Sequence, residues 1–492
     1  MIAAIRSWWR NEDLPTRLAL LGIVLAGGVA RFSALAQPMR YDESVTYLYF
    51  VGRSWATAIT AYPFPNNHLL YTVMAKLAAP LGGGAPWALR LPAFIAGVAV
   101  VPLTFAVGRA LFTRTGALFG AALTAASTPL ILYSANARGY AFVIAAYLIL
   151  LLVGARVRHE GARCCEWITF TVVAAAGLAA IPIMLYPLAA AAFWLALVLL
   201  VDRGRRAWRA LAGLAAAVAA AVGLALLAYL PIIAAHGIGA LVANRFVQAS
   251  AWPQFFAQLT PSLGEMLASW AQPYSLVVGG LLGVAAAAGV VRSTRVSREG
   301  VSVVLAAYVA CAVLLLVSHR APFARTWLWA LPVVALSAGT LGDALVAGPR
   351  LRILTPYLPA IATAVAVAGV AWGFATDALG AMHESGTFAG AEQVAEALAT
   401  QAQHGDRVLA PIPSNAPLQY YMLRAGADTA LLSTPDSVTT REIIVLNAAY
   451  GQTLSWAIAT GMVDTARFGP IAPALHAADG NVYVAERRER DR

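Results

Sequence analysis

The chain has 492 residues, of which 60% are hydrophobic and only 12% are charged, and its mean hydropathy is +0.71. Because a soluble domain carries about 25% charged residues, this composition excludes an ordinary soluble enzyme and predicts a protein that lies mostly in lipid. The net charge of +11 does not indicate nucleic-acid binding, since the arginines lie in short loops between apolar runs. The three cysteines, Cys164, Cys165 and Cys311, predict no disulfide framework, because two are adjacent and the third lies within an apolar run.

Eleven apolar runs are long enough to cross a hydrocarbon core about 30 Å thick. They lie near residues 16–36, 88–111, 116–134, 139–155, 167–183, 185–201, 210–235, 273–291, 300–318, 326–347 and 355–376. The fifth and sixth runs are nearly continuous, and the stretch from Pro182 to Pro187 predicts a tight hairpin or a kink between them. The sequence therefore predicts a polytopic α-helical membrane protein of about 11 spans.

The arginines orient these spans. With the N-terminus inside, 17 of the 34 basic residues, between Arg6 and Arg352, fall at the inside ends of the spans. Short inside loops that are rich in arginine follow the positive-inside rule. The three large polar segments, 37–87, 236–272 and 377–492, are then expected on the outside.

The first apolar run has a second interpretation. Residues 1–36 have a basic start, an apolar core and the segment Ala34-Leu35-Ala36, which is typical of a signal-peptidase site. Arg31 interrupts the run before that segment, and Pro38 follows it closely. We therefore favour an uncleaved first span that anchors the following segment at the membrane surface.

Two adjacent carboxylates, Asp42 and Glu43, follow the first span directly. An ionised carboxylate costs roughly 3 kcal/mol or more toward the centre of a bilayer, so a pair held at the boundary indicates a use. The alternative is a simple charged boundary.

The rest of the outside segment 37–87 predicts two short helices. Over residues 43–60, apolar side chains recur with the spacing of an amphipathic helix, and Pro63 and Pro65 end it. A second helix is expected from His68 to about residue 79. Such helices lie on a membrane and shape an entry for a lipid; the alternative is that they only cover the bundle.

The tail, from about residue 377 to residue 492, has patterns that alternate between strand and helix, which predicts a small α/β domain. Helices are expected over 391–402, 416–424 and 454–459, and strands over 407–410, 442–446 and 482–484. The tail has neither a Gly-rich nucleotide loop nor a metal-type spacing of His or Cys. The chain is thus expected to divide into a transmembrane domain, 1–376, with its outside loop helices, and an outside domain, 377–492.

The order of several motifs resembles a known superfamily. The motifs are Arg40-Tyr41-Asp42-Glu43, Pro65-Asn66-Asn67-His68-Leu69-Leu70-Tyr71, Leu89-Arg90-Leu91-Pro92, Tyr133-Ser134-Ala135-Asn136-Ala137-Arg138-Gly139-Tyr140 and Arg320-Ala321-Pro322-Phe323-Ala324-Arg325. Over residues 16–330 the chain resembles the GT-C membrane glycosyltransferases. It is most similar to bacterial relatives of protein O-mannosyltransferases and of the lipid A aminoarabinose transferase.

The resemblance implies a sugar transfer on the periplasmic side of the bacterial inner membrane. The donor is a sugar on a polyprenyl phosphate, delivered through the membrane, and the acceptor is a hydroxyl of a glycan, a lipid or a protein. The resemblance also implies that a loop acidic residue is the catalytic base and that the anomeric carbon is inverted. A carboxylate within hydrogen-bond reach can take the proton of a hydroxyl that is otherwise a poor nucleophile. We assign Asp42 as this base and expect Glu43 to orient the acceptor or to pair with a basic group.

The leaving lipid phosphate requires positive charge, and four residues on the outside are candidates for supplying it. These donor-binding candidates are His68, Arg138, Arg320 and Arg325. Their alternative roles are a capping histidine, a snorkelling anchor and lipid headgroup contacts.

Tyrosines close to these motifs are candidates for lining a lipid or substrate cavity, although interface tyrosines are common in membrane proteins. The candidates are Tyr41, Tyr62, Tyr71, Tyr133 and Tyr140. No metal site is predicted. A divalent metal beside Asp42 and Glu43 stays an alternative, with no second acidic cluster in a short outside loop to support it.

Two other classes of protein compete with the enzyme. A polytopic transporter or a flippase for lipid-linked sugars would also carry charges at the ends of its spans. Transporters, however, tend to place polar groups in mid-membrane and to show internal repeats, and the spans carry almost no ionisable residues and no repeat. The Asp42-Glu43 pair argues against a non-catalytic assembly subunit.

Overall fold

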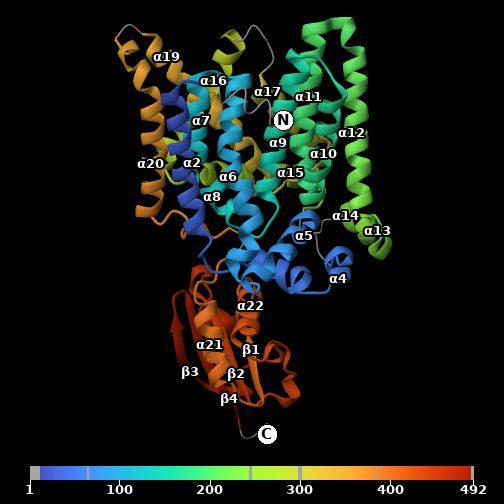
Figure 1. Cartoon of the computed structure of the whole chain (residues 1–492). Coiled ribbons are helices and arrows are strands. Elements are labelled where there is room, and N and C mark those ends of the chain that lie inside the picture. Colours follow the sequence, from blue (N-terminus) through green and yellow to red (C-terminus); the bar gives the residue numbers. More distant parts are fainter. Residues whose placement is uncertain are drawn as a thin grey trace. The chain divides into compact units, whose positions relative to one another are not determined.

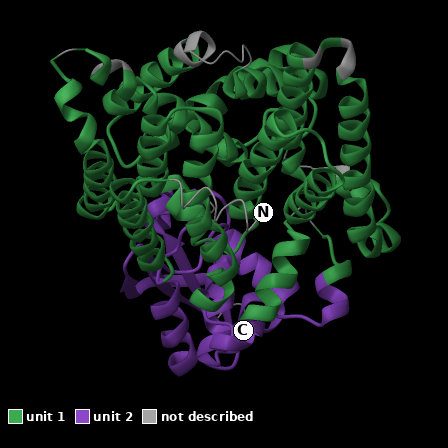
Figure 2. Cartoon of the chain, turned by 45° about the horizontal axis from the view of Figure 1, so that its top comes forward, with its two compact units in different colours: residues 1–35, 59–78, 87–381 green, residues 36–58, 79–86, 382–492 purple. Residues whose placement is uncertain are grey.

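The structure is a computed structural model that describes residues 12–63, 66–242, 247–296, 302–348, 350–384 and 386–488. Arg6 at the inside end and the helix-breaking Pro65 lie outside the described residues. The chain forms two compact units, coloured green and purple in Figure 2. Unit 1 comprises residues 1–35, 59–78 and 87–381, and unit 2 comprises residues 36–58, 79–86 and 382–492.

Unit 1 is helical. Its long helices are α2 (Leu14–Ala34), α6 (Pro86–Leu111), α7 (Arg114–Ala126), α9 (Tyr140–His159), α10 (Cys164–Ala180), α11 (Leu185–Arg203), α12 (Trp208–Ala228), α15 (Trp252–Ala271), α16 (Leu276–Val296), α17 (Val303–Ser318) and α20 (Leu358–Ala375). The shorter ones are α5 (Leu69–Ala78), α8 (Thr128–Ser134), α13 (Leu230–His236), α14 (Gly239–Val242), α18 (Leu331–Gly339) and α19 (Leu341–Ala347). Figure 1 shows the long helices standing side by side in a bundle.

Six helices of the described residues are long and apolar enough to cross a membrane, or up to eight if each bent pair counts as one span. The bent pairs are α7 with α8, at 64°, and α15 with α16, at 98°. Shorter apolar helices cover Leu69–Gly82, Cys164–Ala180 and Val303–Ser318. The chain is therefore a multi-pass membrane protein, and the count of eleven spans stays a prediction.

The expected break between the fifth and sixth apolar runs is confirmed. Helix α10 ends at Ala180, the segment Pro182–Met184 forms a single 3₁₀ turn, and α11 begins at Leu185. A proline at the start of a turn is favourable because its missing N–H is not needed there.

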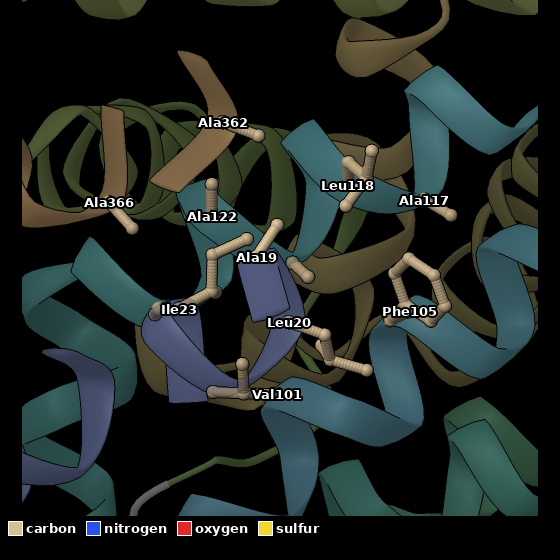
Figure 3. Close-up of a cluster of buried hydrophobic side chains, with 12 residues drawn as sticks. Ala19, Leu20, Ile23, Val101, Phe105, Ala117, Leu118, Ala122, Ala362 and Ala366 are labelled. Carbon is tan, nitrogen blue, oxygen red and sulfur yellow. The ribbon is translucent and has the colours of Figure 1, made fainter. Parts of the chain in front are cut away.

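Small side chains hold four helices of unit 1 together. Ala19, Leu20 and Ile23 of α2 meet Val101 and Phe105 of α6 in a buried cluster (Figure 3). The partners from the other two helices are Ala117, Leu118, Ala121, Ala122 and Ala125 of α7 and Ala362 and Ala366 of α20. Because lipid tails are as apolar as leucine, helices in a membrane associate through close packing, which alanine permits.

Arg31 is fully buried beside this cluster and forms hydrogen bonds with both α7 and α8, on the two sides of the break between them. Its guanidinium donates to the carbonyl oxygens of Thr124 and Ala125, at 3.2 and 3.0 Å, and to Ser134 Oγ at 3.1 Å. Pro129 has no N–H to give to the Ala125 carbonyl four residues earlier, so Arg31 supplies the missing donor. This buried arginine therefore belongs to the packing of the first span.

Unit 2 contains a four-stranded sheet with the order β1-β2-β4-β3. The strands are β1 (Asp406–Leu409), β2 (Arg441–Asn447), β3 (Phe468–Ala477) and β4 (Gly480–Arg487). β1 is parallel to β2, and the other two pairs are antiparallel. The expected tail helices are present as α21 (Ala391–Gln401), α22 (Asn415–Ala425) and α23 (Leu454–Ala459), and α21 packs on β3 and β4 (Figure 1).

Strand β3 was not expected from the sequence. It lies at the edge of the sheet, it is mostly exposed, and it contains Pro470 and Pro473. Proline removes a ladder N–H, argues against a central strand and is tolerated on an edge strand. An exposed edge strand also needs no continuous apolar run, so the sequence pattern did not indicate β3.

The single helix expected over residues 43–60 was wrong. Helix α3 (Tyr41–Thr46) continues as a π-helical turn, Tyr47–Val51, and the chain then breaks before α4 (Trp55–Thr60). The Gly52 N–H donates to the Tyr47 carbonyl oxygen at 2.8 Å, five residues earlier, which widens the helix and ends it. The i, i+3, i+4 pattern continues through this break and could not reveal it.

Candidate active site

The candidate base lies at the start of α3 in unit 2. Asp42 is partly exposed, whereas Glu43 is fully buried. The Glu43 carboxylate accepts a hydrogen bond from the Arg40 backbone N–H at 3.0 Å, three residues before it. This is the reciprocal half of a helix-capping box, so Glu43 has a structural task in starting α3. Of the two carboxylates, Asp42 is therefore the accessible one.

The residues that precede Asp42 in the sequence form hydrogen bonds with the tail within unit 2. The Tyr41 N–H donates to the Gly386 carbonyl oxygen at 2.8 Å. The guanidinium of Arg40 donates through Nη1 to the carbonyl oxygens of Met382, at 2.6 Å, and Glu384, at 2.8 Å. Because Arg40 is only 3% exposed, these charge-assisted bonds form out of water.

Gly386 allows this close approach. Its φ is +72°, a value that side chains rarely adopt. A Cβ at this position would meet the Tyr41 Cβ at 2.6 Å and the Pro413 Cβ at 2.7 Å. The tail backbone can therefore run against the turn that carries Asp42 only because residue 386 has no side chain.

Unit 1 contains a second group of candidates around His68. The Gly139 backbone N–H donates to His68 Nδ1 at 3.1 Å, and Arg138 Nε lies 3.2 Å from the same nitrogen. Burial, together with the charges of Arg138 and Arg325, holds the pKa of His68 well below its ordinary value, so the ring is neutral. Since a neutral imidazole carries one N–H and Nδ1 accepts from Gly139, we assign the proton to Nε2.

This assignment brings two donors together. His68 Nε2 lies 2.9 Å from Arg138 Nη2. With the ring proton assigned to Nε2, both nitrogens are donors. Two donors this close together can share one acceptor. An oxyanion can accept from an imidazole N–H and a guanidinium at once.

Tyr140 and Arg325 complete what we call the cationic cluster: His68, Arg138, Tyr140 and Arg325. Arg325 Nε donates to the Tyr140 hydroxyl at 3.0 Å, and the rings of His68 and Tyr140 lie 5.8 Å apart. Tyr133 packs edge-on against Tyr140 at 4.7 Å. The cluster thus places two guanidinium groups around a neutral histidine, in a site where His68, Arg138 and Tyr140 are buried.

Tyr62 lies beside the cationic cluster. Burial raises the pKa of Tyr62 to about 12, and the charge of Arg138 opposes that rise. Its hydroxyl therefore stays protonated at neutral pH and can act as a donor.

Two further candidates, Arg320 and Tyr71, are not members of the cationic cluster. Arg320 is half-buried, and its charge acts on Tyr186 of α11. Tyr71 is fully buried, and its hydroxyl donates to the Leu89 carbonyl oxygen at 2.6 Å, which ties α5 to α6. Their roles in binding donor or lining a cavity stay predictions, as does the role of Tyr41.

The sequence interpretation missed the tail residues that hold the Asp42 turn. Met39 N donates to the Tyr421 hydroxyl at 3.1 Å, across 382 positions of sequence, and no local pattern marks such a pair. The described residues contain no group of three or more His, Cys, Asp or Glu side chains that could hold a metal ion.

The fold matches that of solved GT-C membrane glycosyltransferases, so the fold that the sequence resemblance implies is confirmed. The structure of ArnT from Cupriavidus metallidurans bound to undecaprenyl phosphate matches with a TM-score of 0.63 at 14% sequence identity. The match covers 94% of this chain and 97% of that one. ArnT in the apo state gives 0.60 at 13% identity, over the same shares of the two chains.

A second, archaeal protein shares the fold. The oligosaccharyltransferase AglB from Archaeoglobus fulgidus, in complex with an inhibitory peptide and a dolichol-phosphate, matches with a TM-score of 0.50 at 12% identity. That match covers 88% of this chain and 70% of AglB. No known protein family and no curated protein matches the chain by sequence.

Proposed function

We propose that this protein is a membrane glycosyltransferase that moves a sugar from a polyprenyl-phosphate donor to an acceptor hydroxyl. The observation that carries the proposal is the buried cationic cluster, in which His68 Nε2 and Arg138 Nη2 lie 2.9 Å apart, close enough to contact one common acceptor. The donor's phosphate is such an acceptor. Support for a lipid-phosphate ligand comes from the fold, since ArnT and AglB structures of this fold hold undecaprenyl phosphate and dolichol-phosphate.

In this proposal the cationic cluster binds the phosphate and carries the developing charge of the leaving group. As the bond between the anomeric carbon and the phosphate oxygen breaks, its electron pair goes to that oxygen. Arg138 and Arg325 stabilise the added charge, and His68 donates from Nε2. A neutral histidine is suited to donate here because it adds no third positive charge beside the arginines.

Asp42 is the proposed catalytic base. It takes the proton of the acceptor hydroxyl while the acceptor oxygen bonds to the anomeric carbon, and displacement from the face opposite the phosphate inverts that carbon. The buried, capping position of Glu43 supports Asp42 over Glu43 as the base.

The proposed setting is the periplasmic face of a bacterial inner membrane, with the acceptor a glycan, a lipid or a protein. It rests on the arginine-rich inside loops and on the donor class, because a polyprenyl phosphate reaches the site through the bilayer. The division into a transmembrane domain, 1–376, and a periplasmic domain, 377–492, belongs to the same proposal.

Mass spectrometry of envelope glycolipids, glycans and proteins tests the function. Cells with the intact gene, with the gene deleted and with Asp42→Asn are compared. The proposal expects one class of molecule to lose the mass of a sugar in both altered strains. A transporter or flippase would keep that sugar in the Asp42→Asn strain while losing it in the deletion, and this outcome would replace the enzyme with the alternative class.

A further inference from the structure

The turn between α8 and α9 carries a buried amide that the proposed reaction does not yet use. Asn136 is fully buried, and none of the described residues forms a hydrogen bond with its Oδ1 or its Nδ2. Its backbone carbonyl accepts from the Arg138 N–H at 2.7 Å, so the two residues belong to one tight turn. The amide is thus fixed two residues from the guanidinium of the cationic cluster.

A buried amide without partners is unusual. In native proteins about 90% or more of buried polar groups are hydrogen-bonded, and groups left over call for an explanation. Asparagine has nearly the shape of leucine, and leucine would fill the same space without this cost. The amide at position 136 is therefore explained by a ligand better than by packing.

The chemistry of the amide selects the kind of ligand group. Asn136 offers one acceptor oxygen and one donor NH₂, so both are satisfied only by groups that donate and accept. An ionised phosphate only accepts, and an isoprenoid chain does neither. A hydroxyl does both, and two neighbouring hydroxyls on a sugar ring can meet the two ends of one amide.

We infer that Asn136 binds the sugar of the lipid-linked donor through ring hydroxyls and so contributes to the choice of sugar. The inference rests on the proposed function, because it takes the phosphate on the cationic cluster as the reference point. The sugar is bonded directly to that phosphate, and Asn136 lies on the same turn as Arg138. The ligand class is thus a hydroxyl-bearing sugar attached to a lipid phosphate.

Binding measurements on the purified full-length protein in lipid nanodiscs separate the sugar from the phosphate. The probes are undecaprenyl phosphate itself and a panel of undecaprenyl phosphates that carry hexoses, pentoses and aminopentoses. For the wild type we expect at least one sugar-bearing probe to bind tenfold or more tightly than the bare carrier. Asn136→Leu should bind the bare carrier within twofold of wild type and lose that preference.

Two further variants keep the test sharp. Asn136→Ala, which is smaller, should lose the same preference and replaces the leucine variant if that one does not fold. Ser127→Ala is the matched control, because Ser127 Oγ is also buried without a hydrogen-bond partner among the described residues but lies at the α7–α8 break. The control should keep the preference for the sugar.

The outcomes distinguish the inference from the proposed function. If the wild type binds bare undecaprenyl phosphate but both Asn136 variants keep the sugar preference, the inference is wrong and the proposed function stands. If the variants lose the bare carrier as well, Asn136 acts on the turn and not on the sugar, and the inference again fails. If the wild type binds no carrier of any kind, the proposed function fails and the inference falls with it.

Discussion

Replacing Arg40 with Met should release the turn that carries Asp42 from the tail of unit 2. The substitution removes two charge-assisted hydrogen bonds, of 2.6 and 2.8 Å, to the carbonyl oxygens of Met382 and Glu384, and it keeps most of the apolar stem. A hydrogen bond to a charged group contributes about 1.5–3 kcal/mol, so the pair contributes roughly 3 kcal/mol or more at this buried position. Since 1.4 kcal/mol is tenfold in an equilibrium, local opening should become about a hundredfold more frequent.

Hydrogen–deuterium exchange on the full chain in nanodiscs measures this opening. Peptides that cover residues 38–46 contain the Tyr41 amide, which is bonded to Gly386, and should lose most of their protection in Arg40→Met. Arg424→Met is the matched control, because Arg424 donates to the Gly83 carbonyl oxygen at 3.2 Å from an exposed position and should change exchange little. Exchange in Arg40→Met within threefold of wild type would refute the view that the tail holds the candidate base.

Three further outcomes are expected. Asp42→Asn keeps the shape of the side chain but cannot take a proton, so turnover should fall roughly a hundredfold to ten-thousandfold with carrier binding retained. Glu43→Gln should lower turnover less. A larger loss of turnover in Glu43→Gln than in Asp42→Asn would move the base to Glu43. Arg138→Lys should weaken undecaprenyl phosphate binding although it preserves charge, because an ammonium lacks the planar fork of donors; unchanged affinity would contradict the phosphate role. Burial raises the pKa of Glu442 to about 7, so the folded state favours the protonated side chain. The stability that protonated Glu442 contributes is therefore fully present below its unfolded pKa near 4.5 and is lost as the pH rises through about 7. That difference corresponds to about 3 kcal/mol, and thermal unfolding of Glu442→Gln between pH 5 and pH 8 should show a flatter pH dependence than wild type.

The fold was predictable where the signal is local. Long apolar runs mark the helices of unit 1 because lipid demands an apolar surface along a whole helix. The tail strand β2 was found because it is buried from Glu442 to Asn447 and reads as a continuous apolar run. The edge strand β3 and the break at Gly52 were missed, since an exposed edge needs no apolar run and a π turn leaves helical periodicity intact.

The candidate site was predictable in its residue types and not in its pairings. The short outside turns pointed to Arg138 and Arg325, but the contact between His68 and Arg138 joins residues 70 positions apart. The capping role of Glu43 had a local signal, a carboxylate three residues after the start of a helix, that a functional interpretation overlooked. The Asn136 amide has no hydrogen-bond partner among the described residues, which becomes visible only when the partners of each buried atom are counted.

The chain passes between the two units five times, after residues 35, 58, 78, 86 and 381. The turn with Asp42 is made early in synthesis, yet Met382, Glu384 and Gly386, which hold it, are made more than 300 residues later. At about 10 residues per second the ribosome needs on the order of half a minute to reach them. The turn of a nascent or truncated chain that ends before residue 386 therefore lacks these bonds, so this arrangement of Asp42 is completed only after more than three quarters of the chain has been made.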